Sequence, residues 1–101
     1  MRDTARELRD GLVDEVIGWY RLLGLSMPGR VEAVMRTVPR HLFTPGVPVG
    51  QAYADDAVLQ KTDGHGVTVS SVSAPGIIAM MLGQLGVEPG QRVLEIGSGV
   101  L

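Results

Sequence analysis

The chain has 101 residues, which is the length of one domain, and its 45% apolar and 20% charged residues are typical of globular proteins rather than disordered ones. A formal net charge of −2 gives no attraction toward nucleic acid or an anionic membrane, and the absence of cysteine excludes disulfides and thiolate metal sites. Because no apolar run approaches the roughly 18 residues of a membrane span and no export signal is visible, we expect a soluble cytoplasmic protein that binds neither nucleic acid nor membranes.

Residues 1–38 are predicted to form a helical cap. Apolar residues recur at spacings of three and four over residues 3–23, which is typical of an amphipathic helix. A second, short helix is expected to have Ser26 or Met27 at its cap and Pro28 in its first turn, and to end before Pro39.

Residues 39–73 are predicted to be a loop with short strands, because proline and glycine impose turns there and extended segments follow at 57–61 and around Val67 and Val69. We interpret Phe43 as the anchor that fixes this loop to the core. His41 is interpreted as a loop histidine bonded to the backbone.

Two charged groups in this loop have a functional and an ordinary interpretation. Arg40 could neutralise a carboxylate. Asp55 and Asp56 could bind a cation, but adjacent carboxylates point in different directions, so we interpret them as a solvated turn. No pattern typical of a metal site or of Ser/His/Asp catalysis occurs, and no metal is predicted.

Residues 74–86 are predicted to be a helix with Ser73 or Ala74 at its cap, Pro75 in its first turn and Gly86 just past its end. Several hydroxyl groups precede this helix, Ser71 and Ser73 among them. They either cap it in the ordinary way or converge with its N–H groups on an anion such as a carboxylate. The spacing does not choose between the two.

Residues 91–99 are predicted to be a buried strand that ends in a tight glycine turn. The apolar residues Val93, Leu94 and Ile96 supply the strand. Gly97, Ser98 and Gly99 supply the turn, where a backbone without Cβ atoms can approach a ligand closely, and Glu95 adds an acidic group at the strand end. This pattern indicates a nucleotide-type pocket.

Several of these segments, in the same order, resemble the protein-L-isoaspartate (D-aspartate) O-methyltransferases, a family of S-adenosylmethionine-dependent repair enzymes. The resemblance covers most of the chain from about Val31 onward. The segments that carry it are residues 38–45 (VPRHLFTP), 52–55 (AYAD), 71–75 (SVSAP) leading into 79–81 (AMM), and 89–99 (PGQRVLEIGSG).

The resemblance implies an α/β fold, in which the helices lead into the first strand of a Rossmann-like methyltransferase sheet. It places Ser73 at the family's active-site serine, with Ser71 and Val72 beside it in the substrate-binding segment. It assigns the first motif for the methyl donor to a set of four residues: Glu95, Gly97, Ser98 and Gly99. The implied reaction is methyl transfer from S-adenosylmethionine to the free carboxylate of isoaspartyl residues in damaged proteins or peptides.

The match is to the N-terminal part of the family only, because family members continue past Gly99 with a further glycine, a helix and several strands, whereas here Leu101 falls where the third glycine would stand and the sequence ends. We therefore expect a truncated member whose single sheet strand lacks partners and promotes self-association. The alternative is a non-catalytic remnant that acts as an interaction module. A dinucleotide oxidoreductase is a third interpretation, but the spacing does not extend to G-x-G-x-x-G.

Overall fold

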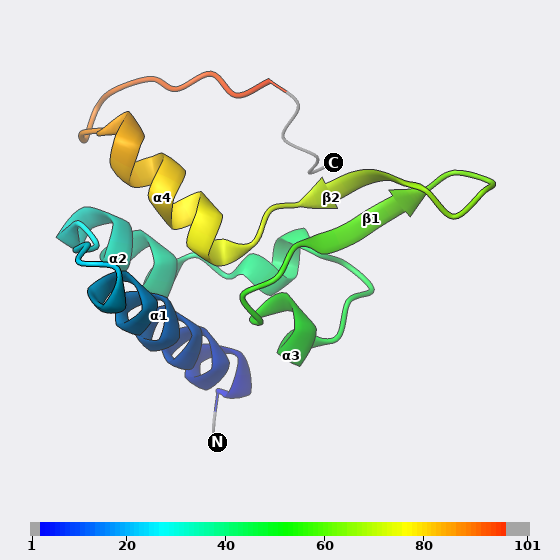
Figure 1. Cartoon of the computed structure of the whole chain (residues 1–101), viewed down its shortest axis with the longest axis horizontal. Coiled ribbons are helices and arrows are strands. Elements are labelled where there is room, and N and C mark those ends of the chain that lie inside the picture. Colours follow the sequence, from blue (N-terminus) through cyan, green and yellow to red (C-terminus); the bar gives the residue numbers. More distant parts are fainter. Residues whose placement is uncertain (1–2, 97–101) are drawn as a thin grey trace.

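The computed structural model describes residues 3–96 of the chain. Its elements in chain order are α1 (Thr4–Leu22), α2 (Gly29–Thr37), the 3-10 helix η1 (Arg40–Phe43), α3 (Val49–Ala52), β1 (Val58–Thr62), β2 (Thr68–Val72) and α4 (Pro75–Leu85). The long helices form one group in which α2 contacts both α1 and α4, and the β1–β2 hairpin extends to one side of this group (Figure 1). No helix within residues 3–96 combines the length and the apolar character needed to cross a membrane.

Helix α1 confirms the predicted amphipathic helix. Asp3 caps its start, where the side chain accepts a hydrogen bond from the Arg6 N–H at 3.1 Å. At its end, Gly24 has a φ of +74°, and the N–H of Leu25 reaches back to the Tyr20 carbonyl at 2.8 Å. This arrangement satisfies carbonyl groups that the helix leaves without partners, and its left-handed position suits glycine.

The core lies between α1, α2, α3 and α4. It is largely aliphatic, and both tyrosines of the chain contribute to it. Its buried members are Leu12, Val16, Tyr20, Val31, Tyr53 and Ala79, and the partly buried side chains of Met27, Met35 and Leu82 pack against them.

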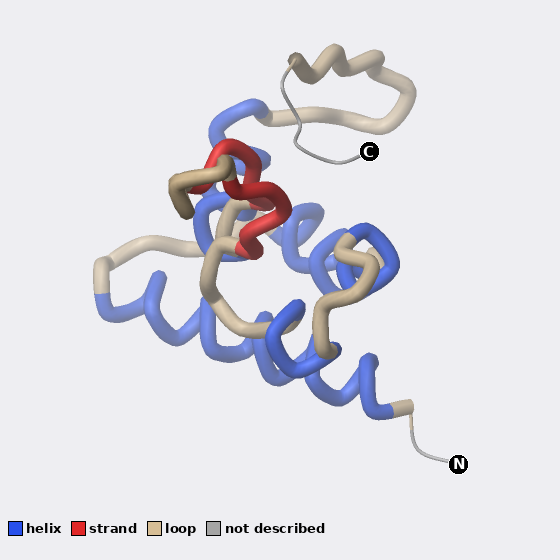
Figure 2. Tube along the Cα trace, turned by 90° about the vertical axis from the view of Figure 1, so that its right-hand side faces the viewer, coloured by secondary structure: helices blue, strands red, loops and turns tan. Residues whose placement is uncertain are grey.

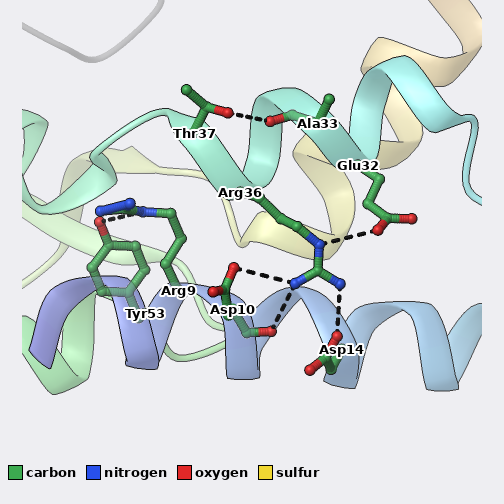
Figure 3. Close-up of polar contacts among 8 residues, drawn as sticks. All are labelled: Arg9, Asp10, Asp14, Glu32, Ala33, Arg36, Thr37 and Tyr53. Carbon is green, nitrogen blue, oxygen red and sulfur yellow. Dashed lines mark hydrogen bonds and ion pairs between the residues drawn. The ribbon is translucent and has the colours of Figure 1, made fainter. Parts of the chain in front are cut away.

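A guanidinium group joins α1 to α2 (Figure 3). Arg36 of α2 contacts Asp14 at 2.7 Å and Asp10 at 3.2 Å on α1, and Glu32 one turn earlier on its own helix at 3.0 Å. Hydrogen bonds to Asp14 and then to Glu32 are the largest causes that raise the pKa of Arg36 above its ordinary value. Three carboxylates thus share one cation at the α1–α2 contact.

The sheet is an antiparallel hairpin, drawn in red in Figure 2. Val58 pairs with Val72 and Leu59 with Ser71, and the register is irregular beyond Leu59. Its turn is closed by one carboxylate, because Asp63 Oδ1 accepts from the N–H groups of His65 at 2.8 Å and Val67 at 2.9 Å. Both strands predicted in the loop region are therefore confirmed, and the second is Thr68–Val72.

The strand predicted at 91–99 is not confirmed. Residues 91–96 have no regular secondary structure, and Leu94 and Ile96 are 85% and 88% exposed. The predicted glycine turn of Gly97, Ser98 and Gly99 lies outside the described residues. A strand needs a neighbour that takes up its backbone N–H and C=O groups, and the hairpin, the only sheet within residues 3–96, does not pair with this segment.

Helix α2 also starts differently from the prediction. Pro28 is its N-cap residue rather than a member of the first turn, and no side chain caps the helix. The Pro28 carbonyl instead accepts from the Glu32 N–H at 3.0 Å, so proline marks the start without using an N–H group of its own.

Candidate functional site

The candidate site is the turn at Ser73 and Ala74, between the end of β2 and the start of α4. The hairpin brings Ser71 and Val72 to one end of this turn, where the Val72 side chain is buried and those of Ser71 and Ser73 are exposed. The three predicted residues Ser71, Val72 and Ser73 are consecutive and lead from β2 into the turn, and both serines are exposed.

Ser73 is not an ordinary helix cap. The N-cap residue of α4 is Ala74, with Pro75 directly after it, and the helix has no cap from a neighbouring side chain. The N–H of Gly76 in the first turn instead donates to Asp55 Oδ1 at 2.8 Å, from a residue 21 positions earlier. The interpretation of Asp55 as a solvated turn residue is thus wrong, because its carboxylate takes up a helix N–H and complements the positive end of the helix.

Arg40 fixes the other side of the turn. Its Nε donates to the Ala52 carbonyl at 2.8 Å, and its Nη2 donates to the Ser73 carbonyl at 2.9 Å. Burial lowers the pKa of Arg40, while Tyr53 and Asp55 act in the opposite direction. The predicted role in neutralising a carboxylate is only indirect here, because the hydrogen bonds of Arg40 go to carbonyl groups and Asp55 acts through its charge.

Tyr20 of α1 completes the contacts to the turn. Its hydroxyl donates to the Gly76 carbonyl at 2.8 Å, and its side chain is buried in the core. Burial, and secondarily the charge of Asp55, raises the pKa of Tyr20 above 10.0. The hydroxyl therefore stays a hydrogen-bond donor into alkaline conditions.

Tyr53 anchors the preceding loop. Its hydroxyl lies 2.8 Å from His41 Nδ1. It also accepts from Arg9 Nε at 3.3 Å, and the Arg9 guanidinium lies 5.5 Å from the ring centroid (Figure 3). The predicted bonding of His41 to backbone is replaced by this side-chain contact. The prediction of Phe43 as the anchor is wrong, because Phe43 is 49% exposed whereas Tyr53 is 5% exposed.

A pocket of about 230 Å³ lies beside the turn, between α1, α2 and α4. Most of its wall is aliphatic, and Arg9, Arg40 and Tyr53 supply its polar groups. It touches the site through Pro75, the first residue of α4.

The residues predicted to bind the methyl donor are not assembled in the described part of the chain. Glu95 is exposed in the loop after α4, and Gly97, Ser98 and Gly99 lie outside the described residues. No group of three acidic or histidine side chains within residues 3–96 is arranged to hold a metal ion.

The sequence around this turn matches known proteins. A family model described as Protein-L-isoaspartate(D-aspartate) O-methyltransferase matches residues 13–100, which include Ser71, Val72 and Ser73. The chain belongs to this family. The membership confirms the resemblance and indicates the fold of the methyltransferases, although the described residues contain no parallel sheet.

Curated relatives carry the same name. A protein-L-isoaspartate O-methyltransferase of Aeropyrum pernix is 40% identical over 97 residues, which are 96% of this chain and 34% of the relative. One of Herpetosiphon aurantiacus is 38% identical over 99 residues, which are 98% of this chain and 40% of the relative. This chain thus spans between about a third and two fifths of the length of these two relatives. No solved structure matches the chain.

Proposed function

We propose that the chain is the N-terminal segment of a cytoplasmic protein-L-isoaspartate O-methyltransferase, which transfers a methyl group from S-adenosylmethionine to the free carboxylate of isoaspartyl residues in proteins or peptides. The observation that carries the proposal is the exposed Ser73 at the start of α4, in a chain that matches the family over residues 13–100. In this proposal residues 91–99 become the first strand of a Rossmann-like sheet when neighbouring strands pair with them.

The residues of the turn suit the substrate half of this reaction. The donor supplies an activated methyl group, and a substrate carboxylate is already ionised at pH 7, so the protein needs no general base. What the reaction requires is orientation of the carboxylate. The Ser73 hydroxyl, with Ser71 and Val72 beside it, is proposed to donate a hydrogen bond to the carboxylate and hold it in line.

The glycine turn is proposed to serve the donor half. Gly97 and Gly99 would let the backbone approach S-adenosylmethionine without a Cβ clash, Ser98 lies between them, and Glu95 would supply an acceptor for the donor's polar groups. This assignment rests on the family match, because the match extends to residue 100.

Binding and transfer measurements test the two halves separately. Titration calorimetry with S-adenosylmethionine should give binding heat that Gly97→Val reduces and Ser73→Ala leaves intact. Methyl transfer to an isoaspartyl peptide should fall at least tenfold in Ser73→Ala and stay unchanged in Ser26→Ala, an exposed serine in the α1–α2 connection. An aspartyl peptide of the same sequence is the substrate control.

A version of the chain extended past Leu101 with the remaining family sequence is the matched comparison. Donor binding by the extended version alone would mean that the pocket needs residues beyond Leu101. If neither version binds the donor, and the chain forms oligomers that grow with concentration, the interaction-module alternative replaces the proposed function.

A further inference from the structure

Three side chains that are far apart in the sequence converge on the short segment 73–76. Arg40 donates to the Ser73 carbonyl at 2.9 Å, Asp55 accepts from the Gly76 N–H at 2.8 Å, and Tyr20 donates to the Gly76 carbonyl at 2.8 Å. These contacts come from α1, from η1 and from the loop after α3. The segment is thus held from three sides through its backbone.

The contacts leave the Ser73 side chain free. All three involve backbone groups of the segment, and the Ser73 side chain is exposed. Because the Cα–Cβ direction of a residue follows from its backbone, fixing the Ser73 carbonyl and the first turn of α4 limits the Ser73 hydroxyl to the few positions that its side-chain rotamers allow. We propose that Arg40, Asp55 and Tyr20 are positioning residues that hold the Ser73 hydroxyl in place for the substrate carboxylate. This inference rests on the proposed function for the role of Ser73.

Asp55 is the central member of this group. It bonds to the first turn of α4, and its charge acts on both Arg40 and Tyr20. The fit around it is tight, because a Cβ atom added to Gly76 would lie 3.0 Å from each carboxylate oxygen of Asp55. A Cβ atom at position 76 would therefore require the carboxylate to move by a few tenths of an ångström.

This tight fit supplies a test in which no polar side chain is removed. Gly76→Ala should displace the Asp55 carboxylate, whereas Gly83→Ala in the same helix adds a Cβ at an ordinary 3.6 Å from Pro28. Amide hydrogen exchange measured by NMR should show Gly76 protected in the wild type. In Asp55→Ala the protection at this amide should fall at least tenfold. In Gly76→Ala the protection of the residue-76 amide should fall to a similar extent. In Gly83→Ala the Gly76 amide should keep its wild-type protection. Equal protection in Asp55→Ala and the wild type would overturn the inference.

Conservative variants separate positioning from simple folding. Asp55→Asn keeps an oxygen acceptor for the Gly76 N–H and should retain most of the protection and most of the methyl transfer. Arg40→Lys keeps the charge but cannot donate to the Ala52 and Ser73 carbonyls in the same fork geometry, so kcat should fall several-fold while the affinity for the donor is unchanged. Arg40→Lys with wild-type kcat, at equal thermal stability, would count against Arg40 as a positioning residue.

The two proposals fail in different ways. If Ser73→Ala transfers methyl groups as fast as the wild type, the proposed role of Ser73 is wrong, and with it the positioning of its hydroxyl. If Ser73→Ala is impaired but Asp55→Ala and Arg40→Lys are as active as the wild type, the proposed function stands and the positioning residues are wrong.

Discussion

The hydroxyl of Tyr20 donates a 2.8 Å hydrogen bond to the carbonyl oxygen of Gly76, 56 positions later in the chain. This bond joins the buried face of α1 to the first turn of α4, which directly follows the candidate site. The same side chain also packs in the core, so the polar contact and the hydrophobic contact stabilise the same junction.

Tyr20→Phe should therefore lower the free energy of unfolding by about 1 kcal/mol, the usual net contribution of one hydrogen bond, because the ring remains packed while the hydroxyl is lost. Urea unfolding followed by circular dichroism measures this loss. Trp19→Phe in the neighbouring position, which is 56% exposed, should change stability by less than about 0.5 kcal/mol. Equal stability of Tyr20→Phe and the wild type would contradict the role of the bond.

The raised pKa of Tyr20 predicts a loss of stability in alkali. The folded state holds the phenol proton more tightly than the unfolded state, whose pKa is near 10.0. This contribution is fully present below pH 10 and is lost as the pH rises through the raised folded pKa. Urea unfolding between pH 8 and pH 11.5 should show a smaller alkaline loss in Tyr20→Phe than in the wild type. Parallel curves for Tyr20→Phe and the wild type would refute the assignment.

Arg36→Met should cost about 1 kcal/mol at low salt, because three carboxylates lose their shared cation, and less at 1 M salt, where exposed charges are screened. Thermal unfolding at the two salt concentrations tests this. Arg30→Met is the control. Arg30 lies 3.8 Å from Glu88, and their side chains are 63% and 66% exposed, so this ion pair contributes little to stability. A loss in Arg36→Met that does not depend on salt would point to packing rather than charge.

Two glycines should respond to alanine in opposite directions. Gly86 ends α4 with a φ of +63°, so Gly86→Ala should destabilise the protein by about 1 kcal/mol. Gly18 lies inside α1 with open space where a Cβ would sit, so Gly18→Ala should stabilise it by up to about 1 kcal/mol. Thermal unfolding of both variants is a direct comparison, and a loss of stability in Gly18→Ala would contradict the prediction from the open space at this position.

Features that depend on neighbours in the sequence could be predicted. The apolar spacing that placed α1 is the spacing that buries Leu12, Val16 and Tyr20, and Gly86 does end α4 in the left-handed conformation expected of it. In both cases the physical cause lies within one or two turns of the residue itself.

Features that depend on partners distant in the sequence could not be predicted. Nothing near Asp55 in the sequence indicates that it reaches the first turn of α4, and nothing near Arg40 indicates the Ser73 carbonyl. Phe43 was expected to fix the loop to the core, but Tyr53 does so instead, because its ring is buried while its hydroxyl contacts His41 and Arg9. The strand predicted over residues 91–96 was not confirmed for a related reason, because a strand depends on a pairing partner that the local sequence pattern does not supply.

The contacts of the segment 73–76 also determine how cooperatively the protein should unfold. Its backbone is bonded to α1, to η1 and to the loop after α3, so α4 cannot detach without breaking contacts to each of them. A region that carries such cross-links opens only with the whole structure, whereas an element bonded within itself can open alone. The helices should therefore melt in one cooperative transition, and the outer end of the hairpin, closed by Asp63, should open before it.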